Sequence, residues 1–389
     1  MAAPVVIAGG GLASVRAAQG LRDLDFSGDI LLVSRESTLP YDRPPLSKDF
    51  LMRRVTEDEI GLVSESQLAE LGVEIMLGCA ASAVDLRSRR LILGGQEVEY
   101  DRLVVATGAR PIELPMFRGF AGAIYLRTIE DARSLREALS SRPSVGIVGG
   151  GFIGLEVAAA ATQLGCRVTV IEAAEEPLVA VLGAEMGGWI RAWHERRGVS
   201  FCCGSPVSSV LGAGRVERLH LADRTALDVD LAVIGVGVRP NIEWLADSGL
   251  DLHRGLVCDQ HGRTSDPHVF GAGDVTCRHS DAGCVVTGHW TAASDQGGAA
   301  AEAVVDAATD EVLADESYFW SDQFGKRFQF SGSVPAGARV SVVNGSLEEE
   351  SYVVHFDSSG VLTGVLALDA PRDFVRASLA LRKSRVAIG

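Results

Sequence analysis

The sequence of 389 residues lacks an excess of positive charge, a long apolar run and any closely paired cysteine motif. Its formal net charge of -15 disfavours nucleic acid and anionic membrane surfaces as partners. We expect no membrane span, because no apolar segment reaches the length that a spanning helix needs. The chain leads almost directly into an expected strand, without the parts of a secretory signal, so we expect a cytoplasmic protein.

The 7 cysteines are scattered, with no C-x-x-C and no Cys/His cluster at zinc spacing, so we expect no metal site. Cys277 and Cys284 flank a loop and could pair, but we expect thiols because disulfides are rare in the cytosol. Hydrophobic residues make up 47% and charged residues 22% of the chain, which is an ordinary globular balance. The length is enough for two or three domains.

Residues 145–172 have the pattern of a strand, a glycine turn, a helix and a second strand that ends at Glu172. Gly149, Gly151 and Gly154 form G-x-G-x-x-G, which allows a tight turn, a close approach of backbone to a pyrophosphate, and close packing of helix on strand. Glu172 could accept both ribose hydroxyls of an adenosine. The carboxylate also favours NADH over NADPH, since no adjacent Arg offers a 2′-phosphate site. A glycine-rich turn in an ordinary α/β unit is the alternative.

The N-terminal residues 4–33 repeat this pattern with Gly9, Gly11 and, in place of the third glycine, Ser14. An internal repeat of a nucleotide-binding unit suggests two dinucleotides in one chain. In this unit, the acidic residue that would bind the ribose is less clear. Glu36 is the better ribose ligand by spacing, whereas Arg35 could lie along the adenine or be solvated.

Two further segments of small residues are typical of a nucleotide crevice. Residues 103–109, LVVATGA, read as a strand that ends in a glycine turn, and residues 264–274 end in G-A-G-D with Asp274 able to accept a hydroxyl hydrogen bond. The alternative for residues 103–109 is an ordinary strand that leads into a loop and contacts no ligand. From about Ser317, expected strands at 340–343, 352–356 and 361–368, a turn at Asn344–Gly345 and a helix from Pro371 predict a small α+β domain.

The chain contains a series of motifs in this order: G-x-G-x-x-S, PYDRPPLSK, LVVATGARP, LRT, G-x-G-x-x-G-LE, GVGVRPN, TSDPHVFGAGD and GHW. In this combination the chain resembles the FAD-dependent NADH–ferredoxin reductases of bacterial Rieske dioxygenase and cytochrome P450 systems. The resemblance covers the whole chain and is weakest over the last seventy or so residues. It implies a glutathione-reductase-like α/β fold with two Rossmann-type dinucleotide-binding domains and a C-terminal α+β domain. The implied FAD domain spans 1–110 and 238–316, the NADH domain 111–237, and the C-terminal domain 317–389.

The resemblance also implies which residues contact the cofactors. Family members usually carry an acid where Arg35 stands, so Glu36 is expected as its substitute. The implied FAD contacts are Gly9, Gly11, Ala13, Glu36, Arg43, Lys48, Ala81, Ala106, Gly108, Arg127, Gly273, Asp274 and Trp290. The implied NADH contacts are Gly149, Gly151, Ile153, Gly154, Glu172 and Gly237.

Three residues are implied to serve the chemistry itself, namely Lys48, Glu156 and Trp320. In the family a lysine near flavin N5 pairs with a carboxylate, and an aromatic residue of the C-terminal domain lies near the ring. Each has a plainer alternative. Lys48 could belong to a solvated basic loop, Glu156 could be stabilised by its helix dipole, and Trp320, like Trp290, could be core packing.

A missing feature sets the subclass. Disulfide reductases and peroxidases of this fold carry reactive cysteines where this chain has PYDRPPLSKDFL (40–51), which contains none. We therefore expect NADH to reduce FAD, and the flavin to pass single electrons to a [2Fe–2S] ferredoxin that feeds an oxygenase or P450. Because that ferredoxin would be acidic, it needs a local basic patch, for which the candidates are Lys326, Arg327, Arg382, Lys383 and Arg385.

Two other functions remain open at this point. The same fold could reduce rubredoxin or monodehydroascorbate, which the PYDRPPLSK-type motif does not exclude. A flavoprotein with a binding or signalling role, as in relatives of apoptosis-inducing factor, would belong to a different class. Those relatives use basic surfaces for nucleic acid, which the acidic charge disfavours.

Overall fold

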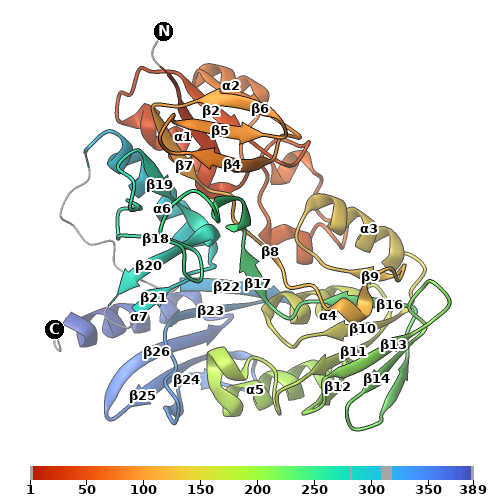
Figure 1. Cartoon of the computed structure of the whole chain (residues 1–389). Helices are drawn as coiled ribbons and strands as arrows, with labels where there is room; N and C mark the ends of the chain where they lie inside the picture. The colour runs from red at the N-terminus through yellow and green to blue at the C-terminus, as the bar shows by residue number, and fades with distance from the viewer. Residues whose placement is uncertain (1–2, 281–282, 308–317, 387–389) are drawn as a thin grey trace. The chain divides into compact units, whose positions relative to one another are not determined.

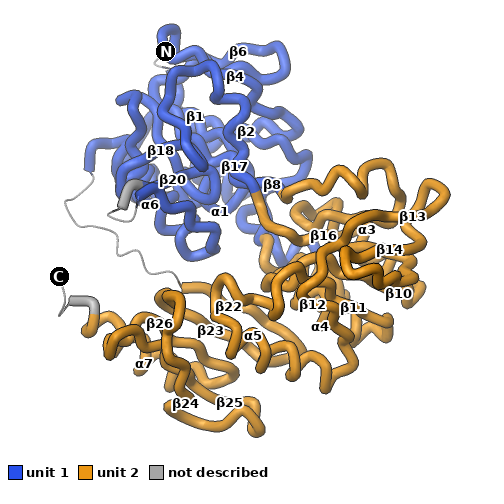
Figure 2. Tube along the Cα trace, turned by 60° about the horizontal axis from the view of Figure 1, so that its bottom comes forward, with its two compact units in different colours: residues 1–42, 57–110, 239–316 blue, residues 43–56, 111–238, 317–389 orange. Residues whose placement is uncertain are grey.

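The computed structural model describes residues 3–280, 283–307 and 318–386, without the side chains of residues 279, 280, 385 and 386. The chain divides into two compact units, coloured separately in Figure 2. Unit 1 comprises Met1–Asp42, Glu57–Arg110 and Arg239–Glu316, and unit 2 comprises Arg43–Thr56, Pro111–Val238 and Ser317–Gly389. The chain changes unit within the short strands β8 (Ala109–Pro111) and β17 (Val238–Pro240), and also after residues 42, 56 and 316.

A parallel sheet organises unit 1, in the order β19-β7-β1-β2-β3. Apart from the edge strand β3, its strands are mostly buried and apolar, as parallel strands covered on both faces require. They are β1 (Val5–Ala8), β2 (Ile30–Val33), β3 (Val73–Met76), β7 (Arg102–Val105) and β19 (Val269–Gly271). The order reverses at β1, since β2 lies on one side of it and β7 on the other. Ligands of such sheets bind beyond the carboxyl ends of the strands at this reversal.

Two helices of unit 1, α1 (Leu12–Asp23) and α6 (Trp290–Val304), pack closely against each other (Figure 1). Gly297 permits this approach, because a Cβ there would lie 2.5 Å from the Ala13 carbonyl oxygen. The buried alanines of both helices join the core under the sheet. The N-terminus of α1 is thereby held directly beyond β1.

Unit 1 also carries a short helix and two smaller sheets. The helix α2 (Glu65–Glu70) begins with a capping box formed by Ser64 and Gln67. The antiparallel sheet contains β4 (Ala81–Asp85), β5 (Arg90–Leu93) and β6 (Gln96–Glu99). The second sheet contains β18 (Leu256–Cys258), β20 (Thr276–Ser280) and β21 (Gly283–Val285). Cys277 and Cys284 form a disulfide across β20 and β21, so the expectation of two thiols was wrong.

A second parallel sheet organises unit 2, in the order β12-β11-β10-β16-β9, and its order reverses at β10. Its strands are β9 (Ala123–Ile124), β10 (Ser144–Val148), β11 (Arg167–Glu172), β12 (Ser200–Cys203) and β16 (Leu231–Ile234). Its helices are α3 (Ile129–Leu139), α4 (Phe152–Gln163) and α5 (Val179–Glu195). An antiparallel sheet of β13 (Val207–Leu211), β14 (Arg218–Leu221) and β15 (Ala226–Asp228) adjoins it in the chain.

The C-terminal part of unit 2 is an antiparallel sheet in the order β22-β23-β26-β25-β24, with one helix, α7 (Pro371–Val386), packed on it. The strands are β22 (Tyr318–Gln323), β23 (Lys326–Gly332), β24 (Arg339–Ser346), β25 (Ser351–Ser358) and β26 (Val361–Leu368). The predicted turn at Asn344–Gly345 was wrong. Both residues pair with β25 beyond a register shift after Val342, and the turn follows at residues 347–350. A bulge tolerates the glycine that would otherwise mark a turn.

The described residues thus form an α/β protein with two Rossmann-type parallel sheets and a C-terminal α+β domain, which confirms the predicted fold class. Within the described part of the chain, no helix combines the length and apolarity that crossing a bilayer demands.

Candidate active site

The first glycine turn joins β1 to α1 and has the form that a pyrophosphate needs. Gly9 has a φ of +147°, and a Cβ there would lie 2.0 Å from the Ala106 carbonyl oxygen. Gly11 is the N-cap of α1, and no side chain caps that turn. A Cβ on Gly11 would meet nothing within 4 Å. Backbone N–H groups at an uncapped helix start, beside open space, fit an anionic phosphate.

Several other predicted FAD residues lie around this turn in unit 1. Ala106 directly follows β7, the strand beside β1, and Gly108 lies two residues further along with a φ of +65°. Gly273 approaches Ala13, since a Cβ on Gly273 would lie 3.1 Å from the Ala13 Cβ. The Trp290 indole N–H donates to Asp42 Oδ1 at 2.6 Å. The half-buried Ala81 and Asp274 also belong to this unit. The structure brings together Gly9, Ala13, Ala106 and Gly273, and their contacts with FAD stay a prediction.

The end of β2 distinguishes the two candidate ribose ligands. Arg35 is exposed, whereas Glu36 is half-buried and accepts a hydrogen bond from the Tyr41 hydroxyl. By strand register, however, Val33 corresponds to Ile171 of unit 2, so Ser34 rather than Glu36 occupies the place of Glu172. Glu36 lies two residues beyond that place, and its role at the ribose stays a prediction.

The second glycine turn, between β10 and α4, repeats the geometry of the first. A Cβ on Gly149 would lie 2.3 Å from the Gly235 carbonyl oxygen, and one on Gly154 would lie 2.3 Å from the Gly149 carbonyl oxygen. Gly151 caps α4 beside open space, as Gly11 does for α1. Ile153 is 45% exposed at the helix start, where an apolar side chain is available to a ligand.

Glu172 lies at the end of β11 and reaches back to this turn. Its carboxylate accepts the Gly150 N–H at 2.6 Å and the Ala174 N–H at 2.9 Å. These bonds hold a negative charge beside the glycine turn. Arg191 of α5 pairs with Glu176 at 3.0 Å, so this arginine is engaged by a carboxylate. Gly237, the last predicted NADH contact, has a φ of +116° and lies beyond β16 in unit 2.

Lys48 and Glu156 form a buried ion pair within unit 2. Residues 44–47 form a short 3₁₀ helix with Lys48 as its C-cap, which turns the lysine inward. Its Nζ lies 3.0 Å from Glu156 Oε1 and donates to the Pro44 carbonyl oxygen at 3.1 Å. Lys48 is 7% exposed and Glu156 4%, so the alternative of a solvated loop was wrong for Lys48. Burial of both charges makes the two side chains mutually dependent.

Two serines that the sequence analysis missed complete the surroundings of Glu156. Ser47 Oγ donates to Glu156 Oε2 at 2.5 Å, and Ser321 Oγ donates to Oε1 at 2.5 Å. The alternating burial of β22 was a usable signal for Ser321, because Phe319, Ser321 and Gln323 are buried while the residues between them are not. Three donors therefore converge on one carboxylate.

Trp320 lies on the opposite face of β22 from Ser321. It is half-buried and stacks on Tyr318 with ring centroids 6.2 Å apart. Its predicted place near the flavin stays a prediction. Arg43 and Arg127 also belong to unit 2, and Arg43 Nη1 donates to the Arg127 carbonyl oxygen at 2.7 Å. The structure thus brings these two predicted FAD residues together, and their contact with FAD stays a prediction.

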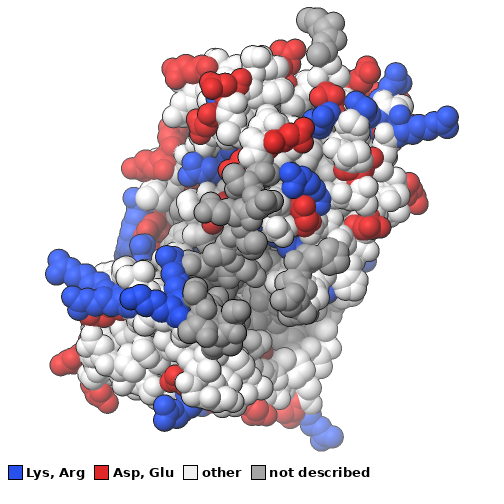
Figure 3. Space-filling model, turned by 90° about the vertical axis from the view of Figure 1, so that its left-hand side faces the viewer, with Lys and Arg blue, Asp and Glu red and all other residues white. Residues whose placement is uncertain are grey.

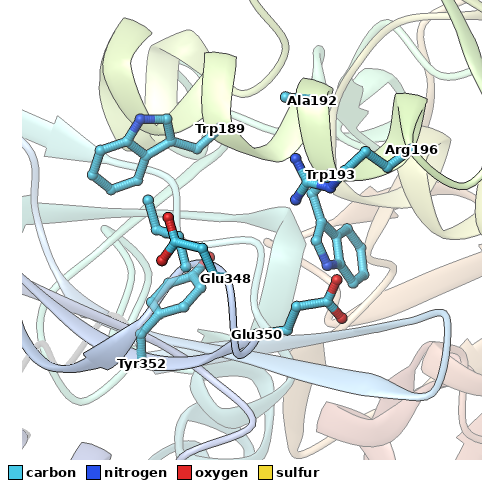
Figure 4. Close-up of a pocket in the computed structure, with 8 residues that line it drawn as sticks. Trp189, Ala192, Trp193, Arg196, Glu348, Glu350 and Tyr352 are labelled. Atoms are coloured by element: carbon cyan, nitrogen blue, oxygen red, sulfur yellow. The ribbon is translucent and has the colours of Figure 1, made fainter.

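A separate cavity of about 450 Å³ lies between α5 and the turn that joins β24 to β25 (Figure 4). Trp189, Trp193 and Arg196 line it from the helix, and Glu348 and Tyr352 face them from the sheet side. None of the predicted site residues lines this cavity. The candidate active site therefore consists of the glycine turns and the Lys48–Glu156 pair, apart from this cavity.

Two glycine turns on parallel sheets, a buried lysine–carboxylate pair and a C-terminal antiparallel domain fit a flavin- and nicotinamide-dependent oxidoreductase. Comparison with family models agrees. Residues 3–297 match the pyridine nucleotide-disulphide oxidoreductase model, and residues 318–387 match the reductase C-terminal model. The chain belongs to the pyridine nucleotide-disulphide oxidoreductase family, whose members of this type use FAD and NADH.

Individual relatives extend the match over nearly the whole chain. A probable ferredoxin reductase of Castellaniella defragrans is 36% identical and covers 98% of this chain and 94% of its own. The ferredoxin–NAD(+) reductase component of an anthranilate 1,2-dioxygenase system in Burkholderia cepacia is 34% identical, covering 95% and 92%. The covalent putidaredoxin reductase–putidaredoxin complex gives a TM-score of 0.92 at 30% identity, covering 97% and 93%. These relatives confirm the resemblance drawn from the motifs.

Proposed function

We propose that this protein is an NADH:ferredoxin oxidoreductase that delivers single electrons to a [2Fe–2S] ferredoxin of an oxygenase or P450 system. The observation that carries the proposal is the buried Lys48–Glu156 pair in a segment where disulfide reductases carry cysteines. When bound, FAD supplies hydride acceptance from NADH and one-electron donation to the ferredoxin. The names of the relatives support this assignment.

The chain's own residues provide binding, orientation and charge. The N-termini of α1 and α4 hold the two pyrophosphates, and Glu172 selects NADH through its ribose hydroxyls. The Lys48 ammonium favours electron density on the flavin, while Glu156 keeps that ammonium in place. Residues 40–51, where disulfide reductases of this fold carry their redox cysteines, contain no cysteine. The Cys277–Cys284 disulfide lies in a different segment, on β20 and β21 of unit 1.

The proposed ferredoxin-docking surface is the exposed face of α7. Arg372, Arg382 and Lys383 are exposed on it, with Val375 57% and Leu379 49% exposed beside them. Positive charge around an apolar centre suits an acidic protein partner. Figure 3 shows one group of Lys and Arg side chains at the left edge of the face in view, with further Lys and Arg side chains at its upper right and Asp and Glu scattered over it.

The other basic candidates are partly neutralised. Lys326 Nζ lies 2.6 Å from Asp369 Oδ2, and Arg327 makes two bonds to Asp322 at 2.7 and 2.9 Å. These pairs make both residues weaker candidates than Lys383 of α7, which is exposed. The Arg385 side chain lies outside the described residues.

We also propose the three-domain division stated above, with FAD on 1–110 and 238–316, NADH on 111–237 and a C-terminal domain over 317–389. The unit boundaries after residues 110, 238 and 316 support this division. Residues 43–56, however, group with unit 2 rather than with the rest of the proposed FAD domain, and unit 2 contains both the NADH domain and the C-terminal domain. A cytoplasmic location is proposed with it, since NADH and reduced ferredoxin are supplied and used there.

The proposal is tested with the purified holoprotein. Its absorption spectrum should show oxidised flavin, and NADH should bleach it. Addition of a [2Fe–2S] ferredoxin from a dioxygenase or P450 system should then give steady NADH oxidation with ferredoxin reduction. NADH bleaching without electron transfer to any such ferredoxin would overturn the acceptor assignment.

Rubredoxin is the second candidate acceptor. A rubredoxin–NAD(+) reductase of Pseudomonas putida is 38% identical over 274 residues, which covers 69% of this chain. Parallel assays with equal concentrations of ferredoxin and rubredoxin separate the two functions. We expect a higher kcat/KM with the ferredoxin, and the reverse order would assign the protein to rubredoxin.

A further inference from the structure

A row of buried polar side chains leads from Glu156 through β22 to α5, entirely within unit 2. Ser321 Oγ donates to Glu156 Oε1 at 2.5 Å, and Gln323 Nε2 donates to Ser321 Oγ at 2.9 Å. Gln323 Oε1 then lies 2.7 Å from His194 Nε2. Ser321 and His194 are fully buried, and Gln323 is 2% exposed. Nothing in the nucleotide-binding motifs requires these three polar residues.

The hydrogen bonds of this row all point toward Glu156. An amide oxygen carries no hydrogen, so His194 Nε2 must be the donor to Gln323. The Gln323 amino group uses its hydrogen on Ser321, which leaves the serine hydroxyl hydrogen for the carboxylate. Burial lowers the pKa of His194 to about 4, which keeps its ring neutral at pH 7. The aromatic rings of Trp193, Phe201 and Phe324 surround it.

The row ends on the same carboxylate oxygen that Lys48 uses. Lys48 Nζ lies 3.0 Å from Glu156 Oε1, and Ser321 donates to that same atom. A carboxylate oxygen can accept hydrogen bonds from both donors, and each hydrogen bond limits how far the carboxylate can shift toward the other donor. The position of the ammonium therefore depends on whether Ser321 donates.

We propose that Ser321, Gln323 and His194 are positioning residues that hold the Glu156 carboxylate, and through it the Lys48 ammonium, in one arrangement for flavin reduction. The inference rests on the proposed function, because it presumes that Lys48 acts on the flavin. It assigns to the C-terminal domain a part in the NADH half-reaction, in addition to its proposed contact with ferredoxin.

A purely structural role for these residues is disfavoured by their chemistry. An apolar side chain would pack β22 on α4 equally well, as Phe319 does against Phe152 with ring centroids 4.6 Å apart. Buried polar groups cost free energy when a hydrogen-bonding atom lacks a partner, as His194 Nδ1 does among the described residues. An apolar residue in place of His194 would avoid that cost. In this row every hydrogen bond is donated toward Glu156, so that the row stabilises the negative charge of its carboxylate.

The first test is Ser321→Ala in the FAD-loaded protein, which removes one oxygen and little volume. Without that donor, Oε1 binds Lys48 alone and neutralises more of its charge. We expect the limiting rate of flavin reduction at saturating NADH to fall on the order of threefold to tenfold. The Kd for NADH and the FAD content should not change. Spectroelectrochemistry should also give a more negative midpoint potential for the bound flavin.

Ser331→Ala is the matched control, since Ser331 is a buried serine on the neighbouring strand β23 outside the row. It should leave both the reduction rate and the midpoint potential at wild-type values. Equal effects of Ser321→Ala and Ser331→Ala would overturn the inference, because general disturbance of the sheet would then explain both.

The decisive test asks whether Ser321 acts through Glu156. In a Glu156→Gln background, adding Ser321→Ala should change the reduction rate no further. Additive losses would show that Ser321 acts independently and would overturn the proposal. Gln323→Leu, which keeps Ser321 in place, should also lower the rate of flavin reduction. A wild-type reduction rate and midpoint potential for this variant would show that Gln323 and His194 have no positioning role.

Lys48→Ala separates this inference from the function on which it rests. If Lys48→Ala leaves flavin reduction unchanged, the proposed function of the pair fails and this inference fails with it. If Lys48→Ala slows reduction while Ser321→Ala does not, the pair stands and only the positioning role is overturned.

Discussion

At the scale of single residues, Lys48 is the side chain whose place the structure sharpens most. It is buried against Glu156 rather than solvated, so its charge acts in a medium that screens it weakly. We expect Lys48→Ala to slow flavin reduction by NADH about 10- to 100-fold while FAD stays bound. Stopped-flow absorbance at the flavin band measures this rate.

The variant leaves the Glu156 carboxylate buried without its cation, which lowers stability as well. Its thermal unfolding should therefore be recorded beside the kinetics. Arg54→Ala is the matched control, because Arg54 belongs to the same segment of unit 2 and its side chain is 53% exposed. A wild-type reduction rate for Lys48→Ala would refute the proposed role.

Glu172 is the residue that should decide between NADH and NADPH. Its carboxylate is held beside the glycine turn by the N–H groups of Gly150 and Ala174, so a 2′-phosphate would meet negative charge. We expect wild-type kcat/KM for NADH to exceed that for NADPH at least tenfold, since each lost bond to a charged group is worth about 1.5–3 kcal/mol.

Glu172→Ala should narrow that preference by raising KM for NADH about tenfold or more, with little effect on kcat. Steady-state assays with both nucleotides and one electron acceptor measure the change. Equal use of the two nucleotides by the wild-type protein would contradict the assignment of Glu172 to the ribose.

At the scale of elements, the end of α5 couples stability to pH through His194. Burial lowers the pKa of His194 to about 4, so the native state resists a proton that the unfolded chain binds readily near pH 6.5. The stability that this histidine contributes is complete above about pH 6.5 and is lost as the pH falls toward 4. The loss over that window should approach about 3 kcal/mol.

Urea unfolding of the wild type and of His194→Phe across this pH range tests the coupling. His194→Phe should be less stable at pH 7, because Gln323 loses its donor, yet its stability should fall less steeply toward pH 4. His253→Gln, at an exposed histidine, is the control and should keep the wild-type slope. Parallel slopes for the wild type and His194→Phe would show that His194 does not carry the pH dependence.

At the scale of the whole molecule, a net charge of -15 opposes an acidic ferredoxin, and only a local basic surface can overcome it. We expect kcat/KM for ferredoxin to fall about tenfold or more between low salt and 0.5 M NaCl, as screening removes the attraction. The NADH-driven bleaching of the flavin should change little, because a small cofactor that binds in a preformed site does not depend on that surface.

Charge reversal identifies the surface. Lys383→Glu on the exposed face of α7 should raise KM for ferredoxin and flatten the salt dependence. The equivalent change at Lys326, which pairs with Asp369, should have a smaller effect on KM. A salt-independent reaction, or a larger effect at Lys326, would rule out docking on α7.

The sequence by itself determined both glycine turns, the strands around them and the family. These features depend on local requirements, such as the space that Gly149 and Gly154 leave for neighbouring backbone, and local requirements are visible in residue spacing. Two expectations drawn from the sequence were wrong, and in both cases pairing between neighbouring strands decided the outcome. Asn344–Gly345 lies inside β24, and Cys277 is bonded to Cys284 rather than left as a thiol.

Only the tertiary structure decided what surrounds the Lys48–Glu156 pair. The resemblance proposed the pair, but its burial and its serine partners depend on segments far apart in the chain, with Ser321 165 residues from Glu156. The same holds for the row that reaches His194, 129 residues from Gln323. A buried carboxylate must collect donors from whichever elements pack against it, and that packing is a property of the folded chain rather than of any one stretch.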